Sequence, residues 1–319
     1  MMRAENSIDN RLDQIRYNPL TPKLALQLAA PHTWAASVFP ALFGILYCVY
    51  RSWEIGVIEA ALLLTACVLM QAAVNTFNDY MDFIKGTDSV QDNLEKEDAV
   101  LLYAGVDPRK VRNLAFAFLG TAALIGLFFT VRKGPVPLLI GLVGGMIVLL
   151  YSGGPVPISY LPVGELISGF VMGALIPLGI AAAVTGELHP EVLPLCLPLV
   201  TGIGLIMMTN NTCDIEKDER AGRRTFPNCI GRERAVLVYR GAVILWMILI
   251  VSDGAAVSRT AIIASLAAVA AAYIPVYRFL LHSPLEQSTR VAQMKGILKA
   301  NICSGMICLM IMVIAALGR

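Results

Sequence analysis

The sequence predicts an all-α integral membrane protein in which nine transmembrane helices surround a central cavity. Hydrophobic residues make up 57% of the 319 residues and charged residues only 15%, whereas soluble domains average about 45–50% apolar and about 25% charged residues. The apolar residues fall into blocks, and each block is close to the length that a tilted helix needs to cross a bilayer. Both observations argue against the alternative, a large soluble protein with buried helices.

Nine apolar segments follow one another along the chain. They are residues 33–50, 55–77, 114–131, 136–151, 166–185, 192–211, 235–252, 260–277 and 300–317. Residues 1–30 carry charges and lack an apolar core, so we expect a cytoplasmic N-terminal segment and no cleavable signal peptide. Residues 31–319 are predicted to form a single nine-helix domain. Two glycine pairs, Gly141–Gly145 and Gly169–Gly173, predict close helix packing in the fourth and fifth segments.

The distribution of Lys and Arg predicts the orientation in the membrane. If the N-terminus lies inside, 20 of the 25 basic residues fall on the inner side. The positive-inside rule therefore places the N-terminus in the cytoplasm and the C-terminus outside. The two charge-rich loops, residues 78–113 and 212–234, then lie on the same cytoplasmic side. Arg240 lies near the cytoplasmic end of the seventh segment, where it can extend to the interface or face the interior.

The cysteines and the other sequence motifs narrow the range of functions. None of the seven cysteines forms a CxxC pair, and we interpret them as small core residues rather than a disulfide framework or zinc site. No GxGxxG, P-loop or nucleophile-elbow pattern stands out. We accordingly expect a lipid bilayer environment and no nucleic-acid partner.

An acidic cluster follows the second segment in the stretch NTFNDYMDFIKGTD, Asn75 to Asp88. Asn78 and Asp82 are four residues apart, so on a helix they share one face. Asp79 points about 100° away from that face and ranks behind them as a ligand.

A second cluster, NNTCDIEKDERAGRRT, follows the sixth segment. Asp214 and Asp218 would stack on one face of a continuing helix, with Asn211 one turn earlier. The octapeptides NTFNDYMD and NTCDIEKD match at three positions, which suggests a weak internal repeat. We predict that both clusters lie on the same membrane side.

Carboxylate and amide oxygens suit magnesium or manganese. Magnesium takes only one or two protein carboxylates and fills its shell with water and substrate phosphates. Two carboxylate faces can therefore hold a diphosphate between them through bridging metals. Lys217, Arg220, Arg223 and Arg224 can neutralise the remaining charge. The substrate would be an isoprenyl or lipid-linked diphosphate with its tail among the helices. The alternative is a pair of solvated loops with helix caps and salt bridges.

At these residues the chain resembles the UbiA-type intramembrane aromatic prenyltransferases. The stretches NDYMDFIKGTD, NNTCDIEKDERAGRRT and YSGGPVPISYLPVGEL are most similar to the naphthoate prenyltransferases of menaquinone synthesis and their animal relatives. The resemblance implies magnesium-dependent transfer of a polyprenyl group from prenyl diphosphate to an aromatic acceptor, with Mn²⁺ as an alternative metal. For the naphthoate group the acceptor is 1,4-dihydroxy-2-naphthoate, which loses its carboxylate as carbon dioxide. We expect a multi-pass protein of the cell inner (cytoplasmic) membrane, with a site that opens on the cytoplasmic side.

The resemblance also assigns roles to individual residues. The implied metal ligands are Asn78, Asp82, Asp88, Asp214 and Asp218, of which Asp82, Asp214 and Asp218 are also the implied catalytic residues. The implied substrate-binding residues are Asn78, Asp79, Lys85, Asn211, Lys217, Arg220, Arg224 and Tyr151. Tyr151, Tyr80 and Tyr103 are candidates to face an allylic cation, with membrane-interface anchors as the alternative.

Three positions depart from the family pattern. Ala30, Ala99 and Cys213 stand where the family or its naphthoate group carries arginine, and Lys23, Lys85 or Lys96 are candidate substitutes. Two alternative functions remain at this stage. One is a UbiA-type enzyme with another acceptor, such as 4-hydroxybenzoate. The other is a membrane transporter, although acidic residues at one membrane face rather than at the midplane disfavour it.

Overall fold

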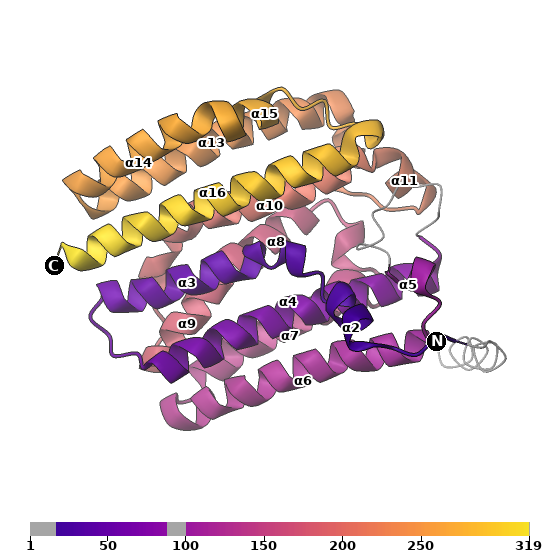
Figure 1. Cartoon of the computed structure of the whole chain (residues 1–319), viewed down its shortest axis with the longest axis horizontal. Coiled ribbons are helices and arrows are strands. Elements are labelled where there is room, and N and C mark those ends of the chain that lie inside the picture. The colour runs from indigo at the N-terminus through magenta and orange to yellow at the C-terminus, as the bar shows by residue number, and fades with distance from the viewer. Residues whose placement is uncertain (1–16, 88–99, 319) are drawn as a thin grey trace.

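The computed structural model describes residues 17–87 and 100–318. Its long helices lie side by side along the long axis of the molecule (Figure 1). The first half contains α2 (Pro22–Leu28), η1 (Pro31–Thr33), α3 (Ala35–Tyr50), α4 (Val57–Lys85), α5 (Val100–Ala104), α6 (Pro108–Lys133), α7 (Val136–Ser152) and η3 (Ile158–Tyr160).

The second half continues with the same kind of element. It contains α8 (Gly164–Phe170), η4 (Val171–Leu175), α9 (Ile176–Thr185), η5 (Pro190–Cys196), α10 (Leu197–Cys213), α11 (Ile215–Arg220), α12 (Phe226–Ile230), α13 (Arg232–Val257), α14 (Arg259–Ala272), η6 (Tyr273–Tyr277), α15 (Arg278–Leu281), η7 (Gln287–Thr289) and α16 (Arg290–Leu317). The segments η4 and η6 are single π-helical turns that join neighbouring helices into longer rods.

Over the described ranges, seven helical rods are long and apolar enough to cross a membrane. The pair formed by Pro22–Thr33 and Ala35–Tyr50, which bends by 65°, is an eighth candidate. The remaining predicted span is α7, a shorter apolar helix of 17 residues. The all-α membrane fold is therefore confirmed, and the count of nine and the cytoplasmic N-terminus stay predictions.

Local chemistry explains where several helices begin and end. Asp107 caps α6 by accepting a hydrogen bond from the Arg109 backbone N–H at 2.9 Å, and Pro108 occupies the first turn, a position where its missing N–H costs nothing. Ser258 caps α14 in the same way through Ala261. Gly86, with φ of +65°, ends α4 in the left-handed conformation that glycine adopts without strain.

Helix α3 packs against both α4 and α16, so one of the first long helices lies beside the last. Helix α10 contacts α8, α13 and α16, which places it at the centre of the second half. Helices α5 and α11 lie at one end of the molecule and the C-terminus at the other (Figure 1). The described residues of the two acidic clusters, at the end of α4 and at the junction of α10 and α11, therefore lie at the same end of the bundle.

Only one of the two predicted glycine contacts is present. A Cβ atom on Gly173 would lie 2.4 Å from the backbone N of Val200, and one on Gly169 would lie 2.6 Å from the Val200 carbonyl oxygen. Only glycine permits this approach of the fifth and sixth segments. The prediction of close approach at Gly141 and Gly145 was wrong, because a Cβ atom on Gly141 would meet nothing within 4 Å and one on Gly145 would meet only a side-chain carbon of Leu119, at 3.9 Å.

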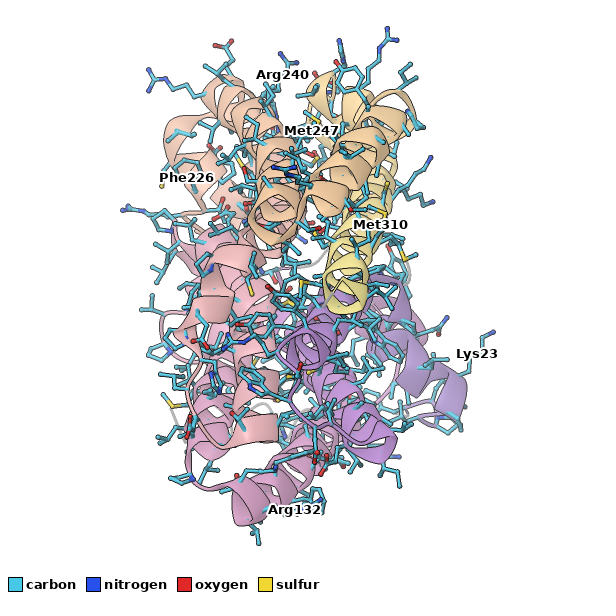
Figure 2. The ribbon with its side chains drawn as sticks, turned by 90° about the vertical axis from the view of Figure 1, so that its left-hand side faces the viewer. Lys23, Arg132, Phe226, Arg240, Met247 and Met310 are labelled. Atoms are coloured by element: carbon cyan, nitrogen blue, oxygen red, sulfur yellow. The ribbon has the colours of Figure 1, made fainter. Side chains whose placement is uncertain are left out.

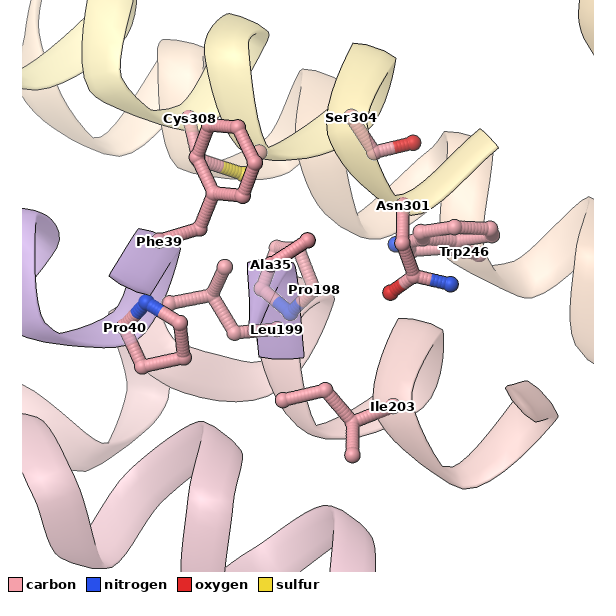
Figure 3. Close-up of a pocket in the computed structure, with 11 residues that line it drawn as sticks. Ala35, Phe39, Pro40, Pro198, Leu199, Ile203, Trp246, Asn301, Ser304 and Cys308 are labelled. Atoms are coloured by element: carbon pink, nitrogen blue, oxygen red, sulfur yellow. The ribbon is translucent and has the colours of Figure 1, made fainter. Parts of the chain in front are cut away.

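An open apolar groove of about 370 Å³ lies against α7, η3, α8 and η4, where Ile147, Ile158 and Phe170 line it. A cavity of about 10 Å³ lies among α3, α10, α13 and α16, lined in part by Phe39, Trp246 and Asn301 (Figure 3). That volume corresponds to about one water molecule, so it does not hold a substrate. The central substrate cavity stays a prediction. All seven cysteines are free thiols; six are buried or half-buried, as expected of small core residues, whereas Cys229 is exposed.

The outer surface is apolar where the helices would meet lipid. Leu124, Ile263 and Ile274 are each more than half exposed, an arrangement that suits a hydrocarbon solvent. Arg240 is exposed at the periphery of the bundle (Figure 2). The side chain therefore points outwards, which decides between the two positions that the sequence left open.

Candidate active site

One face of α4 carries the first half of the site. The helix continues beyond the apolar segment predicted to end at residue 77 and includes the whole of NDYMDFIK. Asn78 Nδ2 donates to Asp82 Oδ2 at 3.0 Å, which confirms that these residues share a face. Deeper on this face, Gln71 Nε2 donates to Asn75 Oδ1 at 3.1 Å. Polar side chains thus follow α4 from the membrane interior towards its end.

The second half of the site lies at the junction of α10 and α11. Asp214 separates the two helices, with φ of −102° and ψ of 18°, so the continuing helix expected from the sequence is interrupted there. The Asp218 backbone N–H nevertheless donates to the Asp214 carbonyl at 2.8 Å, which keeps the two residues one turn apart. Both carboxylates are buried.

Arg223 joins the two acidic clusters. Its guanidinium donates to Asp82 Oδ1, and its Nη1 lies 3.8 Å from Asp218 Oδ1. The Arg223 side chain is 14% exposed, so this bridge is largely shielded from solvent. The contact shows directly that Asp82 and Asp218, 136 positions apart in the chain, face a common space.

Helix α7 and the following loop form one wall of this space. Ser152 Oγ donates to Asn78 Oδ1 at 2.6 Å, and Lys85 Nζ donates to the Ser152 carbonyl at 2.8 Å. The ring of Tyr160 lies 4.8 Å from Lys85 Nζ and 5.0 Å from the Arg223 guanidinium carbon. Such cation–π contacts hold two positive groups beside the carboxylates.

Asp214 has a separate cationic partner. Arg290, the first residue of α16, donates from Nε to Asp214 Oδ2 at 3.1 Å and from Nη2 to Asn210 Oδ1 at 2.7 Å. Lys217 is buried and interacts electrostatically with Asp214 and Asp218. Positive groups therefore surround both carboxylates of the second cluster.

Asn211 is part of a third polar group. Its Nδ2 donates to Glu165 Oε1 at 2.8 Å, and Glu165 lies at the buried start of α8. The Tyr151 hydroxyl, at the end of α7, interacts electrostatically with Glu165, Arg223, Asp82 and Asp218. Tyr151 is accordingly the tyrosine candidate beside the acidic clusters, whereas Tyr103 is exposed.

Three predicted site residues have other surroundings. Asp79 accepts hydrogen bonds from the backbone N–H groups of Val100 and Leu101, at 2.7 and 3.1 Å, at the start of α5. Arg220 is exposed and donates to the Glu216 carbonyl in its own helix. Arg224 is exposed, and Asp88 lies outside the described residues. Their roles in substrate or metal binding stay predictions.

Burial shapes the charges of the site. Loss of solvation raises the pKa of Asp218 to about 6 and also raises the pKa of Asp214. Burial alone would lower the pKa of Arg223, but Asp82 and Asp218 hold it above its usual value. The guanidinium therefore stays charged, and the two carboxylates gain from any cation placed beside them.

The donors fit a magnesium site that is shared with a substrate. Among the residues that the structure describes, no three His, Cys, Asp or Glu side chains form a complete metal-binding group. Asn78, Asp82, Asp214 and Asp218 supply only oxygen ligands, and Asp214 Oδ1 accepts no hydrogen bond within the described chain, although it lies 3.1 Å from Arg290 Nε in an ion pair. Magnesium needs only one or two such carboxylates when phosphates and water complete its shell.

Three further residues at this site, Glu165, Tyr160 and Arg290, were not predicted from the sequence. Glu165 and Tyr160 belong to the stretch YSGGPVPISYLPVGEL, and a Glu at the start of an apolar segment was the available signal. Arg290 lies ten residues before the last apolar segment. Gln293, Asn301 and Ser304 are buried polar residues of α16, and Arg290 is buried at the start of the same helix.

Comparison of the chain with known proteins identifies its family. Residues 37–299 match the model of the UbiA prenyltransferase family. The chain is 33% identical over 233 residues to the 1,4-dihydroxy-2-naphthoate octaprenyltransferase of Bacillus subtilis, covering 72% of this chain and 74% of that protein. It is 30% identical over 187 residues to the enzyme of the same name from Mycobacterium tuberculosis, covering 57% of this chain and 62% of that protein.

Solved structures share the fold. A UbiA homolog from Archaeoglobus fulgidus bound to DMAPP and Mg²⁺ aligns with a TM-score of 0.61 at 18% identity, covering 90% of this chain and 99% of that chain. The apo structure of a UbiA homolog from Aeropyrum pernix aligns with a TM-score of 0.65 at 17% identity, covering 87% and 97%.

Proposed function

This chain belongs to the UbiA prenyltransferase family, and from that premise we propose that it transfers a polyprenyl group from prenyl diphosphate to 1,4-dihydroxy-2-naphthoate with loss of the carboxylate. The observation that carries the proposal is the Arg223 bridge between Asp82 and Asp218. It brings both acidic motifs to one space at one end of a membrane bundle. The naphthoate acceptor is supported by the similarity to the Bacillus enzyme and by the motif KGTD.

Asn78, Asp82, Asp214 and Asp218 would hold Mg²⁺, and we keep Asp88 in the ligand set as a prediction. When bound, the metal would neutralise the diphosphate and favour departure of this group from the allylic carbon. Mn²⁺ is the alternative ion, since it accepts the same oxygen ligands.

The cations of the site would bind the diphosphate directly. Arg223 contacts both acidic motifs, and Lys85 contacts the same Tyr160 ring as Arg223. A guanidinium offers several donors in a plane and can turn from a carboxylate to a phosphate oxygen. We assign Arg223 and Lys85 to the phosphate oxygens, with Lys217 as an additional positive charge.

Arg290 is the proposed counterpart of the arginine that the naphthoate motif carries at position 213. Cys213 is buried and lies 3.4 Å from Gln293 Oε1, and so carries no charge to the site. Arg290 reaches Asp214 and Asn210 from another helix. The Arg290 guanidinium, from α16, thus contacts residues on either side of position 213 in the second acidic motif.

The site would open to the cytoplasm. This assignment rests on the excess of Lys and Arg in the loops at the site end. The prenyl tail would lie among the helices, where apolar walls protect an allylic cation from water.

The proposal is tested with purified protein in detergent, a long-chain prenyl diphosphate, Mg²⁺ and 1,4-dihydroxy-2-naphthoate. We expect release of pyrophosphate and a prenylated, decarboxylated product by mass spectrometry, both abolished by a chelator and restored by excess Mg²⁺. A product with 4-hydroxybenzoate but none with the naphthoate would refute the acceptor and keep the chemistry. No release of pyrophosphate with any phenol would refute the proposed reaction.

A further inference from the structure

Several buried polar atoms beside the acidic clusters have no hydrogen-bond partner among the described residues, and two of them belong to side chains that form no ion pair there. These two are Glu165 Oε2 and the Tyr151 hydroxyl. Glu165 is only 7% exposed, and its other oxygen is held by Asn211 Nδ2 at 2.8 Å. Asn211 therefore fixes the carboxyl group, while the second oxygen of that group is buried without a hydrogen-bond donor.

The two atoms lie at the same end of α8. The Tyr151 oxygen is 3.8 Å from the position that a Cβ atom on Gly164 would occupy, one residue before Glu165. The hydroxyl is also close enough to Arg223, Asp82 and Asp218 to interact with them electrostatically. Tyr151 belongs to the last turn of α7, and Asn211, which holds Glu165, belongs to the last turn of α10. Both helices are apolar segments that end before Asp218, so Tyr151 and Glu165 lie on the membrane side of Asp218.

We propose that Glu165 and Tyr151 bind a ring hydroxyl group of the aromatic acceptor, and this inference rests on the proposed function. The hydroxyl would donate to Glu165 Oε2, and Tyr151 would donate to an oxygen of the same ring. A buried carboxylate oxygen without a donor is unfavourable. The ligand that completes this site must therefore supply a hydrogen-bond donor.

Of the three groups that the two substrates bring to the site, only the aromatic acceptor has the polar groups that Glu165 and Tyr151 need. The prenyl tail has no donor, and an anionic diphosphate would be repelled by Glu165. A hydroxylated aromatic ring supplies both the donor for Glu165 and an oxygen for Tyr151. Its hydrogen bond to a carboxylate also raises the electron density at the ring carbon ortho to the hydroxyl, which is the kind of carbon that attacks an allylic cation.

The test compares ligands that differ in one donor. Binding of 1,4-dihydroxy-2-naphthoate and of its two monomethyl ethers is measured by calorimetry for the wild type, Glu165→Gln and Tyr151→Phe. The wild type should bind the diol about 10- to 100-fold more tightly than one of the ethers, since a hydrogen bond to a charged group is lost. In Glu165→Gln this ratio should fall close to one.

Binding of prenyl diphosphate with Mg²⁺ is the second readout, and Glu187→Gln is the matched control because Glu187 is exposed and far along the chain from the acidic clusters. Glu165→Gln should keep wild-type affinity for prenyl diphosphate, and the control should match the wild type throughout. An unchanged diol-to-ether ratio in Glu165→Gln would overturn the inference and leave the proposed function intact. Loss of prenyl diphosphate binding together with acceptor binding would also overturn it, by showing a structural role.

The two proposals can fail separately. If the wild type binds another phenol in place of the naphthoate, with the same dependence on Glu165, the inference stands and the proposed acceptor fails. If the wild type binds prenyl diphosphate but no hydroxylated aromatic, both fail.

Discussion

Arg223→Ala tests the electrostatic design of the site. The substitution removes a guanidinium that contacts both Asp82 and Asp218. The two carboxylates would then face a common buried space without it. We expect lower stability of the metal-free protein, and a larger stabilisation by Mg²⁺ than the wild type shows.

The structure sets the size of the effect. The side chains of Arg223, Asp82 and Asp218 are 14%, 11% and 3% exposed, so solvent screens their charges only partly. Two unit charges about 4 Å apart interact by about 4 kcal/mol at an effective dielectric constant of about 20. Removal of one partner from a buried pair costs about 3–5 kcal/mol. We therefore expect a loss of roughly 3 kcal/mol, which corresponds to a decrease in melting temperature on the order of 5–10 °C.

The assay is thermal unfolding in detergent, followed by tryptophan fluorescence, with and without millimolar Mg²⁺. Arg220→Ala is the matched control, because Arg220 is exposed and donates to the carbonyl of Glu216 in its own helix. Mg²⁺ should restore part of the stability lost in Arg223→Ala, since a dication would replace the missing positive charge.

The reasoning would be refuted if Arg223→Ala matched Arg220→Ala in both melting temperature and Mg²⁺ response. A decrease in stability that Mg²⁺ leaves unchanged would show that Arg223 stabilises the fold without sharing the metal-binding space.

Three further predictions concern the site, the orientation and the fold. Asp82→Ala and Asp214→Ala should each reduce product formation below detection while the protein stays folded in the membrane; wild-type turnover in both variants would contradict the metal-site assignment. Cys229, an exposed cysteine at the site end, should react with a membrane-impermeant maleimide only from the cytoplasmic side of oriented vesicles, and labelling from the outer side would invert the topology. Gly173→Leu should lower stability by about 3 kcal/mol through its collision with the backbone of α10, whereas Gly141→Leu, with nothing within 4 Å of its Cβ position, should unfold at the wild-type temperature.

Much of the architecture could be predicted because it depends on local sequence. Apolar blocks of membrane length predicted helical segments that the structure contains, and the spacing of Asn78 and Asp82 predicted their shared face. The interruption of the helix at Asp214 was missed, since a spacing of four residues is compatible both with a continuous helix and with two short helices joined at one residue.

Contacts between distant segments could not be predicted in the same way. Arg223 was one of four basic residues in the second motif, and only the folded chain shows that it reaches Asp82. Arg290 and Glu165 come from other helices altogether. Spacing within a motif does not indicate partners that lie many positions away, so these contacts depend on the packing of α8, α10 and α16.

The most direct measurement uses 1,4-dihydroxy-2-naphthoate labelled with carbon-13 in its carboxylate, together with a prenyl diphosphate and the purified protein. We predict that labelled carbon dioxide and pyrophosphate appear in equal amounts, only when Mg²⁺ is present. A prenylated product that retains the label, or pyrophosphate release without prenylation of the ring, would contradict the proposed reaction.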